Sequence, residues 1–277
     1  MNADFARLDT GFVEIDEPAG ALRVAYVRHG KGTPLVLLHG GSGSRNHWIR
    51  NIEPLSRHFE VIAPDLPGFG DSGDVDPEID LEGYRSLMHA AIDKLIGKAP
   101  FQLAGFSYGG LISCAVAAAA GRRVLGLTML APGGFGKPVG RTFTLLKPRK
   151  ELGEEGLWQV YWENCGNMMF HDQGLLDEVS VGLYRDDIER ARFRNWGISW
   201  KDSLVPTLAK VAAPAQMIYG TGDRTVTPSV MYRTARCHGA KPEMRIHIVR
   251  DVGHWSSYEA ADEVNEILIN FHGPAGA

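Results

Sequence analysis

Short apolar runs alternate with longer amphipathic stretches along most of this chain. The apolar runs predict strands at residues 34–38, 59–63, 101–105, 125–130, 215–219 and 244–249. The amphipathic stretches predict helices at residues 45–57, 82–97, 108–120, 228–237 and 258–272. Such alternation favours an α/β fold with a mostly parallel sheet, helices on both faces, and a functional site at the carboxyl ends of the strands.

Both ends of the pattern are consistent with this arrangement. Residues 11–28 alternate apolar and polar side chains, which predicts two strands joined by a hairpin around Pro18-Ala19-Gly20. In the last helix, Val264, Ile267, Leu268 and Phe271 follow the i, i+3, i+4, i+7 spacing of an apolar stripe. That stripe is expected to face the sheet.

The alternation of strands and helices stops after Gly134 and resumes near Pro206. The block between them is rich in large apolar and aromatic side chains, with helical spacing in places. We therefore predict a core of residues 1–132 and 207–277 and a helical insertion of residues 133–206. Most of the insertion's aromatic side chains would form its own core, and a minority would line a pocket.

Composition narrows the classes of function. The chain has 277 residues and a net charge of −4, so it offers no basic face for nucleic acid and no polybasic membrane patch. Its three cysteines lack metal-binding spacing, and a reducing, cytoplasmic compartment is the simplest expectation. No secretory signal or long apolar span is visible. We expect a small-molecule substrate and no metal or cofactor, and the sequence leaves a homodimer open.

A candidate nucleophile stands between the third predicted strand of this series and the helix after it. The segment Gly105-Phe106-Ser107-Tyr108-Gly109 predicts a sharp strand-to-helix turn that holds the serine in a cramped backbone conformation. Only very small neighbours two positions away on each side allow such a turn. Ser107 is therefore expected to present its hydroxyl above the sheet edge, although a glycine-rich turn without chemistry would look the same.

A serine hydroxyl needs a base, usually a histidine that a carboxylate orients. Asp223 follows the predicted strand 215–219, and His254 follows the predicted strand 244–249. Other candidates have simpler explanations. His247 lies inside a strand pattern and is interpreted as a surface or packing residue. We interpret six further candidates as solvated: His171, His238, His272, Asp251, Asp202 and Asp187.

The order Ser107, Asp223, His254, each just past a strand, resembles the α/β-hydrolase superfamily. The resemblance extends to His39-Gly40-Gly41-Ser42-Gly43, which matches the oxyanion-hole loop and implies a structural role for His39. It also extends to residues 61–72, where Asp65 is expected to stabilise a turn. It implies an oxyanion hole made by the backbone N–H groups of Gly41 and Tyr108. It also implies that residues 133–206 form a helical cap over the serine.

Residues 253–265 resemble the carboxyl-terminal segment of the C–C bond hydrolases that act on ring-fission products of aromatic catabolism. In that family a tryptophan follows the base and a cap arginine holds the acidic substrate. The resemblance implies substrate contacts for Trp255 and for Arg190 or Arg192, with Arg194 a further possibility. Phe106, which is also expected to contact substrate, stands where those hydrolases carry asparagine. This difference favours a plainer ester, amide or lactone substrate.

Two other interpretations stay open. The glycine-rich segments at residues 39–43 and 105–110 are also similar to those of proline iminopeptidases, although their His-Gly-Gly-Pro-Gly loop has Ser42 in place of proline here. A binding protein on the same fold would keep the pocket without turnover. The sequence favours a cofactor-independent serine hydrolase, in which His254, oriented by Asp223, takes the proton of Ser107.

Overall fold

The structure is a computed structural model of the chain, and it describes residues 8–17, 20–140 and 143–273. One sheet of eight strands forms its centre, in the order β1-β2-β4-β3-β5-β6-β7-β8. The strands are β1 (Asp9–Glu17), β2 (Gly20–His29), β3 (Pro34–Leu38), β4 (Glu60–Pro64), β5 (Phe101–Phe106), β6 (Val124–Leu130), β7 (Ala215–Gly220) and β8 (Arg245–Val249). β3 to β8 run parallel, and β2 is antiparallel to both β1 and β4.

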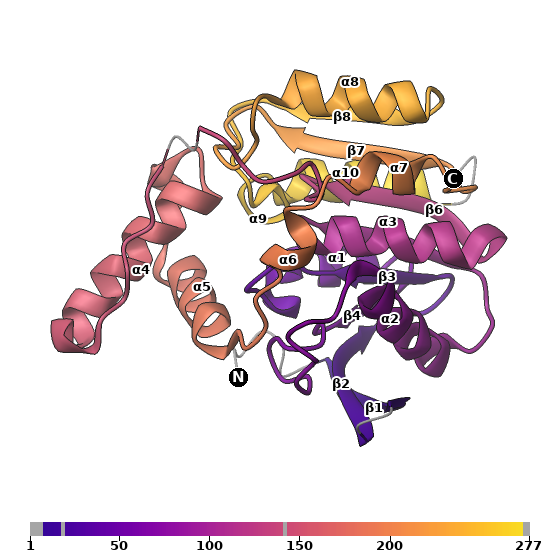
Figure 1. Ribbon diagram of the computed structural model, residues 1–277, viewed down its shortest axis with the longest axis horizontal. Coiled ribbons are helices and arrows are strands. Elements are labelled where there is room, and N and C mark those ends of the chain that lie inside the picture. Colours follow the sequence, from indigo (N-terminus) through magenta and orange to yellow (C-terminus); the bar gives the residue numbers. More distant parts are fainter. Residues whose placement is uncertain (1–7, 18–19, 141–142, 274–277) are drawn as a thin grey trace.

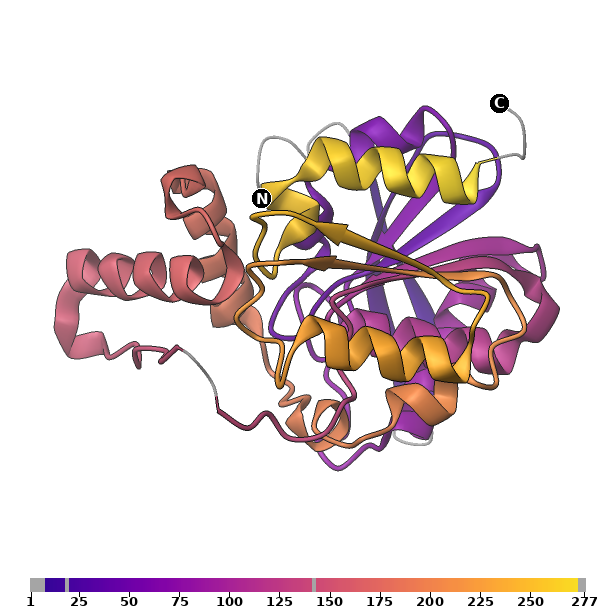
Figure 2. The ribbon, with the colours of Figure 1, turned by 90° about the horizontal axis from the view of Figure 1, so that it is seen from above.

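Helices cover both faces of the sheet (Figures 1 and 2). On one face lie α1 (Ile52–Ser56), α9 (Ser256–Glu259) and α10 (Ala261–His272), and on the other lie α2 (Leu81–Ile96), α3 (Tyr108–Ala120), α7 (Leu204–Leu208) and α8 (Val230–Ala240). Leu35 to Leu38 of β3 are fully buried, as expected for a parallel strand that is covered on both sides. The predicted α/β fold is therefore confirmed.

Two details of the prediction change. The helix predicted at residues 45–57 is a 3₁₀ turn, Arg45–Trp48, followed by α1. Pro54 lacks the N–H that a helix interior needs, so the helix can begin only one turn before it. In the predicted hairpin, β1 pairs with β2 from Asp9 opposite Arg28 to Glu17 opposite Gly20. Pro18 and Ala19 of its turn lie outside the described residues.

The helices α4 (Gly153–Met169), α5 (Glu178–Arg190) and α6 (Trp196–Ser199) come between β6 and α7. In Figures 1 and 2, α4 and α5 lie to the left of the sheet and cover neither of its faces. Short 3₁₀ turns, Lys150–Leu152 and Gln173–Leu175, flank α4, and another, Gly121–Arg123, follows α3. Within the described ranges, no helix is long and apolar enough to cross a membrane.

Candidate active site

Ser107 lies on a strained turn between β5 and α3. Its φ is 53° and its ψ is −114°, a backbone conformation that residues other than glycine rarely adopt. The turn is held by hydrogen bonds: the Ser107 N–H donates to Leu130 O at 2.8 Å, and the Gly133 N–H donates to Ser107 O at 3.0 Å. The sharp turn predicted from the glycines is therefore present.

The two glycines that flank the turn have no room for a side chain. A Cβ atom on Gly105 would lie 2.1 Å from Ser113 Oγ and 2.2 Å from Gly109 O. A Cβ atom on Gly109 would lie 2.3 Å from His39 O, which belongs to the loop after β3. Gly105 of β5 is thus packed against α3, and Gly109 of α3 is packed against the loop after β3. These contacts fix the height of Ser107 above the sheet.

We expect Gly105→Ala to lower the free energy of unfolding by about 1–3 kcal/mol or more, because the added methyl group meets backbone atoms that cannot move aside. Urea denaturation monitored by circular dichroism measures the change. Gly182→Ala in α5 is the matched control, since nothing lies within 4 Å of its added Cβ and alanine favours helices. Equal stabilities of the two variants would contradict the packing argument.

Three side chains from separate loops meet above the sheet. His254 Nε2 lies 3.0 Å from Ser107 Oγ, and His254 Nδ1 lies 2.8 Å from Asp223 Oδ2. Ser107 and His254 are 147 positions apart in the sequence. They meet because β5, β7 and β8 are parallel and end at the same edge of the sheet.

The surroundings of Asp223 favour the ionised form of its carboxyl group. Burial alone would raise the pKa of its carboxyl group, but the charge and hydrogen bond of His254 and the hydrogen bonds of Thr225 outweigh burial and lower the pKa. The Thr225 hydroxyl donates to Asp223 Oδ1 at 2.7 Å and also lies 3.0 Å from His254 Nδ1. The sequence analysis missed Thr225, whose only local signal is its position two residues after the aspartate.

A cavity of about 330 Å³ opens above Ser107. Its wall includes Ser107, His254, Gly41 and Tyr108. Among the described residues, no acceptor receives the N–H of Gly41 or that of Tyr108, the first residue of α3. Both free donors therefore belong to the lining of the cavity that holds the serine.

Buried polar contacts hold the loop that carries Gly41. His39 is fully buried, and burial lowers its pKa to about 3, so the ring stays neutral. Its Nε2 accepts the N–H of Leu66 at 2.7 Å. His47 Nδ1 accepts the N–H of Gly40 at 3.1 Å, and Asp65 accepts the N–H groups of Arg45 and Asp71. These contacts agree with a structural role for His39 and a turn-stabilising role for Asp65.

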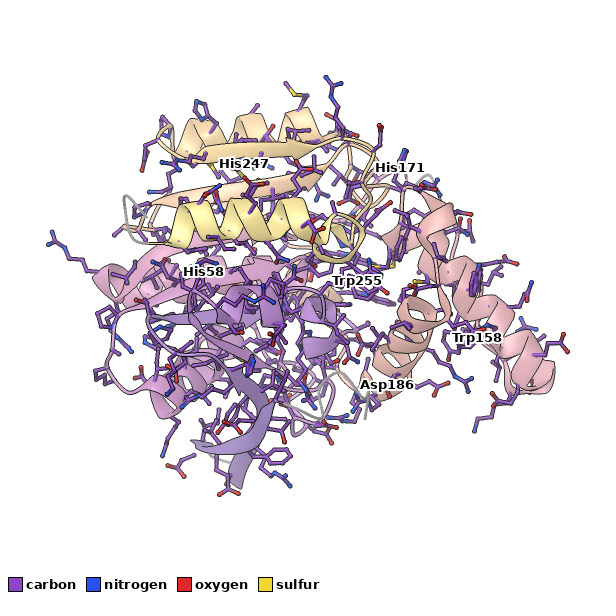
Figure 3. All side chains as sticks on the ribbon, turned by 180° about the vertical axis from the view of Figure 1, so that it is seen from behind. His58, Trp158, His171, Asp186, His247 and Trp255 are labelled. Atoms are coloured by element: carbon purple, nitrogen blue, oxygen red, sulfur yellow. The ribbon has the colours of Figure 1, made fainter. Side chains whose placement is uncertain are left out.

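Two side chains expected to touch substrate are not part of the cavity lining. Trp255 is fully buried, and its Nε1 donates to His47 O at 2.9 Å. Figure 3 shows it where α9 adjoins the rest of the core. Phe106 is also fully buried, with its ring 4.8 Å from the His254 ring. The predicted direct contacts with substrate are therefore corrected, because Phe106, the last residue of β5, and Trp255, which directly precedes α9, are packed in the interior and do not line the cavity.

The two arginines that were expected to hold the substrate make ion pairs away from the cavity. Arg190 binds Asp71 at 2.6 Å and Asp186 at 2.5 Å, and Arg192 binds Asp74 at 2.5 Å. Neither belongs to the cavity lining. Their predicted contact with substrate is also corrected: these guanidinium groups join the end of α5 to the loop after β4. Arg194 does not line the cavity either.

Two residues interpreted as solvated are in fact buried. The His272 ring lies 2.7 Å from Thr128 Oγ1 and 2.8 Å from Gln102 Oε1, and burial lowers its pKa to about 3. Asp187 is 1% exposed, and its Oδ1 accepts hydrogen bonds from Ser44 Oγ and Asn46 Nδ2. Burial raises the Asp187 pKa to about 8. Asp251 and Asp202 are exposed, as expected.

The insertion supplies much of the remaining cavity wall. Its contribution includes Met168, Tyr184, Ile188, Asn195, Trp196, Ser199 and Trp200, and Arg233 of α8 lies on the core side. Asn195 lies so close to Gly41 that a Cβ there would be 2.7 Å from Asn195 Nδ2. No local pattern in the sequence distinguishes these residues from their neighbours, so the sequence analysis did not find them.

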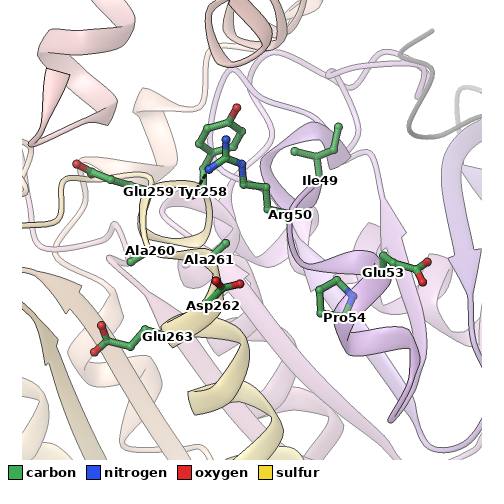
Figure 4. A pocket seen from close by; sticks show the side chains of 10 residues that line it. All are labelled: Ile49, Arg50, Glu53, Pro54, Tyr258, Glu259, Ala260, Ala261, Asp262 and Glu263. Carbon is green, nitrogen blue, oxygen red and sulfur yellow. Dashed lines mark hydrogen bonds between the residues drawn. The ribbon is translucent and has the colours of Figure 1, made fainter. Parts of the chain in front are cut away.

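A second hollow, of about 480 Å³, lies at the surface between the start of α1 and the segment that joins α9 to α10 (Figure 4). It is lined by Arg50, which packs 3.7 Å above the Tyr258 ring, and by Glu53, Glu259, Asp262 and Glu263. Ser107, Asp223 and His254 are not part of this hollow. In the part of the chain that the structure describes, no group of acidic, histidine and cysteine side chains could hold a metal ion.

A known protein family matches most of this chain. The profile of the Alpha/beta hydrolase family matches residues 35–267, which include Ser107, Asp223 and His254. The chain belongs to this family. This alpha/beta hydrolase is 30% identical, over 290 aligned positions, to the 2-hydroxy-6-oxononadienedioate/2-hydroxy-6-oxononatrienedioate hydrolase of Escherichia coli K12. The alignment covers 94% of each chain.

Other relatives of this alpha/beta hydrolase differ in length or activity. It is 31% identical to the dihydrolipoyllysine-residue acetyltransferase component of the acetoin cleaving system of Pseudomonas putida, over 87% of this chain but only 63% of that protein. Among solved structures, a membrane phospholipase A has a TM-score of 0.74 at 25% identity, with coverage of 95% of this chain and 85% of the other. The alpha/beta hydrolase is thus an enzyme of the hydrolase class.

Proposed function

We propose that this alpha/beta hydrolase is a cofactor-independent serine hydrolase that acts on a small carbonyl compound. The observation that carries the proposal is the pair of distances around His254, 3.0 Å to Ser107 Oγ and 2.8 Å to Asp223 Oδ2. This arrangement matches the geometry of a nucleophile, a general base and a carboxylate that orients the base.

The proposed reaction has two halves. His254 Nε2 takes the proton of Ser107 as Oγ attacks the substrate carbonyl carbon, and the same proton passes to the leaving group when the tetrahedral intermediate collapses. Water, deprotonated by His254, then attacks the acyl-serine and releases the acid and free Ser107. The N–H groups of Gly41 and Tyr108 are positioned to donate to the oxyanion in each half.

We also propose that residues 133–206 are a cap and that residues 1–132 and 207–277 are the core. The contribution of α6 and the ends of α4 and α5 to the cavity wall supports this division. α7 begins at Leu204, three residues before the proposed core resumes at residue 207, and packs against α3 and α8 of the core. A cap of this kind would exclude water from the acyl-serine until the leaving group departs.

The relatives support a proposal for the substrate class. We propose an ester, amide or lactone, or a C–C bond next to a ketone, since the Escherichia coli relative hydrolyses an oxo-dienedioate by name. We also propose that the enzyme takes part in aromatic catabolism and that it forms a homodimer. A reducing, cytoplasmic location is consistent with Cys114, Cys165 and Cys237, which are buried and unpaired.

Incubation with an uncharged alkyl fluorophosphonate tests the proposal. We expect the intact mass to rise by one phosphonyl group, and peptide mapping to place that group on Ser107. The variant Ser107→Ala should gain no mass under the same conditions. An unlabelled wild-type protein that is folded by circular dichroism would contradict an activated serine and favour the ligand-binding alternative.

A further inference from the structure

Two arginines are buried in the part of the chain that the structure describes, and they differ in their partners. Arg45 is 9% exposed and binds the carboxylates of Asp65 and Asp71. Arg233, in the first turn of α8, is 7% exposed, and no carboxylate of a described residue lies within 4.0 Å of its nitrogens. The charge of Arg233 is therefore buried without a counter-ion.

The surroundings of Arg233 give it only neutral contacts. Nε donates to Thr227 O at 3.3 Å and Nη1 donates to Pro132 O at 3.4 Å, both long hydrogen bonds. The guanidinium carbon lies 4.8 Å from the centre of the Phe135 ring. The buried Tyr219 hydroxyl is a further neutral partner, because its hydrogen bond with Arg233 opposes the rise that burial causes in the Tyr219 pKa. None of these partners carries a negative charge.

The nearby carboxylates are engaged elsewhere. Asp223 binds His254 and Thr225, and Asp202 binds both terminal nitrogens of Arg236. Burying an arginine charge without an opposite charge is unfavourable, and a guanidinium fork binds a carboxylate through two parallel hydrogen bonds. Because no described residue supplies such a group, a bound anion is the partner that the site lacks.

Arg233 lines the same cavity as Ser107 and His254. The backbone also connects them, since Pro132 O accepts from Arg233 and the next residue, Gly133, donates to Ser107 O. Most other side chains of the cavity wall are apolar, including Met168, Ile188 and the stacked pair Trp196 and Trp200. The cavity therefore has a mostly apolar wall, the proposed nucleophile Ser107 and the cationic side chain of Arg233.

We propose that Arg233 is the anion-binding residue of the substrate cavity, and that the substrate carries a free carboxylate on an apolar body a few bonds from the carbonyl that Ser107 attacks. This inference rests on the proposed function, because it deepens the description of the same site. Arg233 is a specificity-determining residue: it holds the carboxylate and so places the carbonyl at Ser107.

Two esters of equal length test the inference. The p-nitrophenyl ester of valeric acid ends in a methyl group, and the p-nitrophenyl monoester of glutaric acid ends in a carboxylate at the same position. We expect Arg233→Met to lower kcat/KM for the glutarate ester roughly 30- to 100-fold, as for a lost charge-assisted pair, and to change the valerate ester less than about threefold. Arg233→Lys should restore part of the loss.

The matched control is Arg236→Met, on the same helix but outside the cavity, which should leave the ratio of the two kcat/KM values unchanged. Equal losses for both esters in Arg233→Met, or a wild-type enzyme that does not prefer the glutarate ester, would overturn the inference. Labelling of Ser107 by the uncharged fluorophosphonate should proceed at the wild-type rate in Arg233→Met, and this readout separates the two proposals.

Binding without turnover gives an independent measurement. Trp196 and Trp200 line the cavity, so their fluorescence should respond when 4-phenylbutyrate binds. We expect saturable quenching in the wild type and in Ser107→Ala, and a dissociation constant at least about tenfold higher in Arg233→Met. If wild type and Arg233→Met bind 4-phenylbutyrate equally, the guanidinium is structural and the inference fails. If Ser107 proves inert while the difference in binding persists, only the catalytic proposal falls.

Discussion

The variant Ser107→Ala is expected to lose about 10⁶-fold in kcat against its best ester substrate, as removal of a nucleophile from a cooperating set of residues does. The alanine lacks the oxygen that lies 3.0 Å from His254 Nε2, so no acyl-enzyme can form. Steady-state kinetics with p-nitrophenyl esters measure the loss. Residual turnover would come from water activated by His254 and from the free N–H donors of the cavity.

Ser42→Ala is the matched control for this experiment. Ser42 also has a φ of 53° and lines the same cavity, but it makes no hydrogen bond to His254. Replacement of a serine at positive φ is thus tested without removing the nucleophile, and we expect less than about a tenfold loss. A loss below tenfold in Ser107→Ala itself would refute the assignment of the nucleophile.

The second large effect is expected for Asp223→Asn, which should lower kcat by about 10⁴-fold. An asparagine that keeps its bond from the Thr225 hydroxyl presents an N–H to His254 Nδ1. His254 would then carry its proton on Nε2, where it cannot accept the proton of Ser107. The geometry survives, but the tautomer is wrong. Steady-state kinetics and a circular dichroism spectrum together separate this effect from misfolding.

Asp251→Asn is the control for the second experiment. Asp251 precedes the segment that carries His254, is exposed, and has a φ of 55°, which asparagine tolerates well. We expect its kcat to stay within about threefold of the wild type. If both aspartate variants lost activity equally, the orientation of His254 would not depend on Asp223.

Arg190 and Arg192 have a structural role instead of the substrate contact that the sequence predicted. Arg190 and Arg192 connect the end of α5 to the loop after β4, where Arg190 and Arg45 both bind Asp71. They therefore connect these two segments of the chain. Among the described residues that line the cavity, the one arginine is Arg233 of α8, and we propose that it is the cation that meets the substrate.

The sequence by itself determined the strands, most of the helices and the residues of the proposed catalytic set. Each of these depends on local patterns: a buried parallel strand is a short apolar run, and the turn at Ser107 needs small residues at fixed offsets, which are Gly105 and Gly109. The order of serine, aspartate and histidine follows from the order of the strands. These features could be predicted because residues within a few positions of one another fix them.

The tertiary structure alone decided which charged and aromatic side chains are buried and what they face. Arg233 reaches Pro132 across 101 positions, and Asp187 reaches Ser44 across 143. In the sequence Arg233 resembles a surface residue of an amphipathic helix, and Asp187 resembles its exposed neighbour Asp186. Burial and pairing depend on contacts between distant segments, and a local pattern of polar and apolar residues carries no information about which segment will lie opposite.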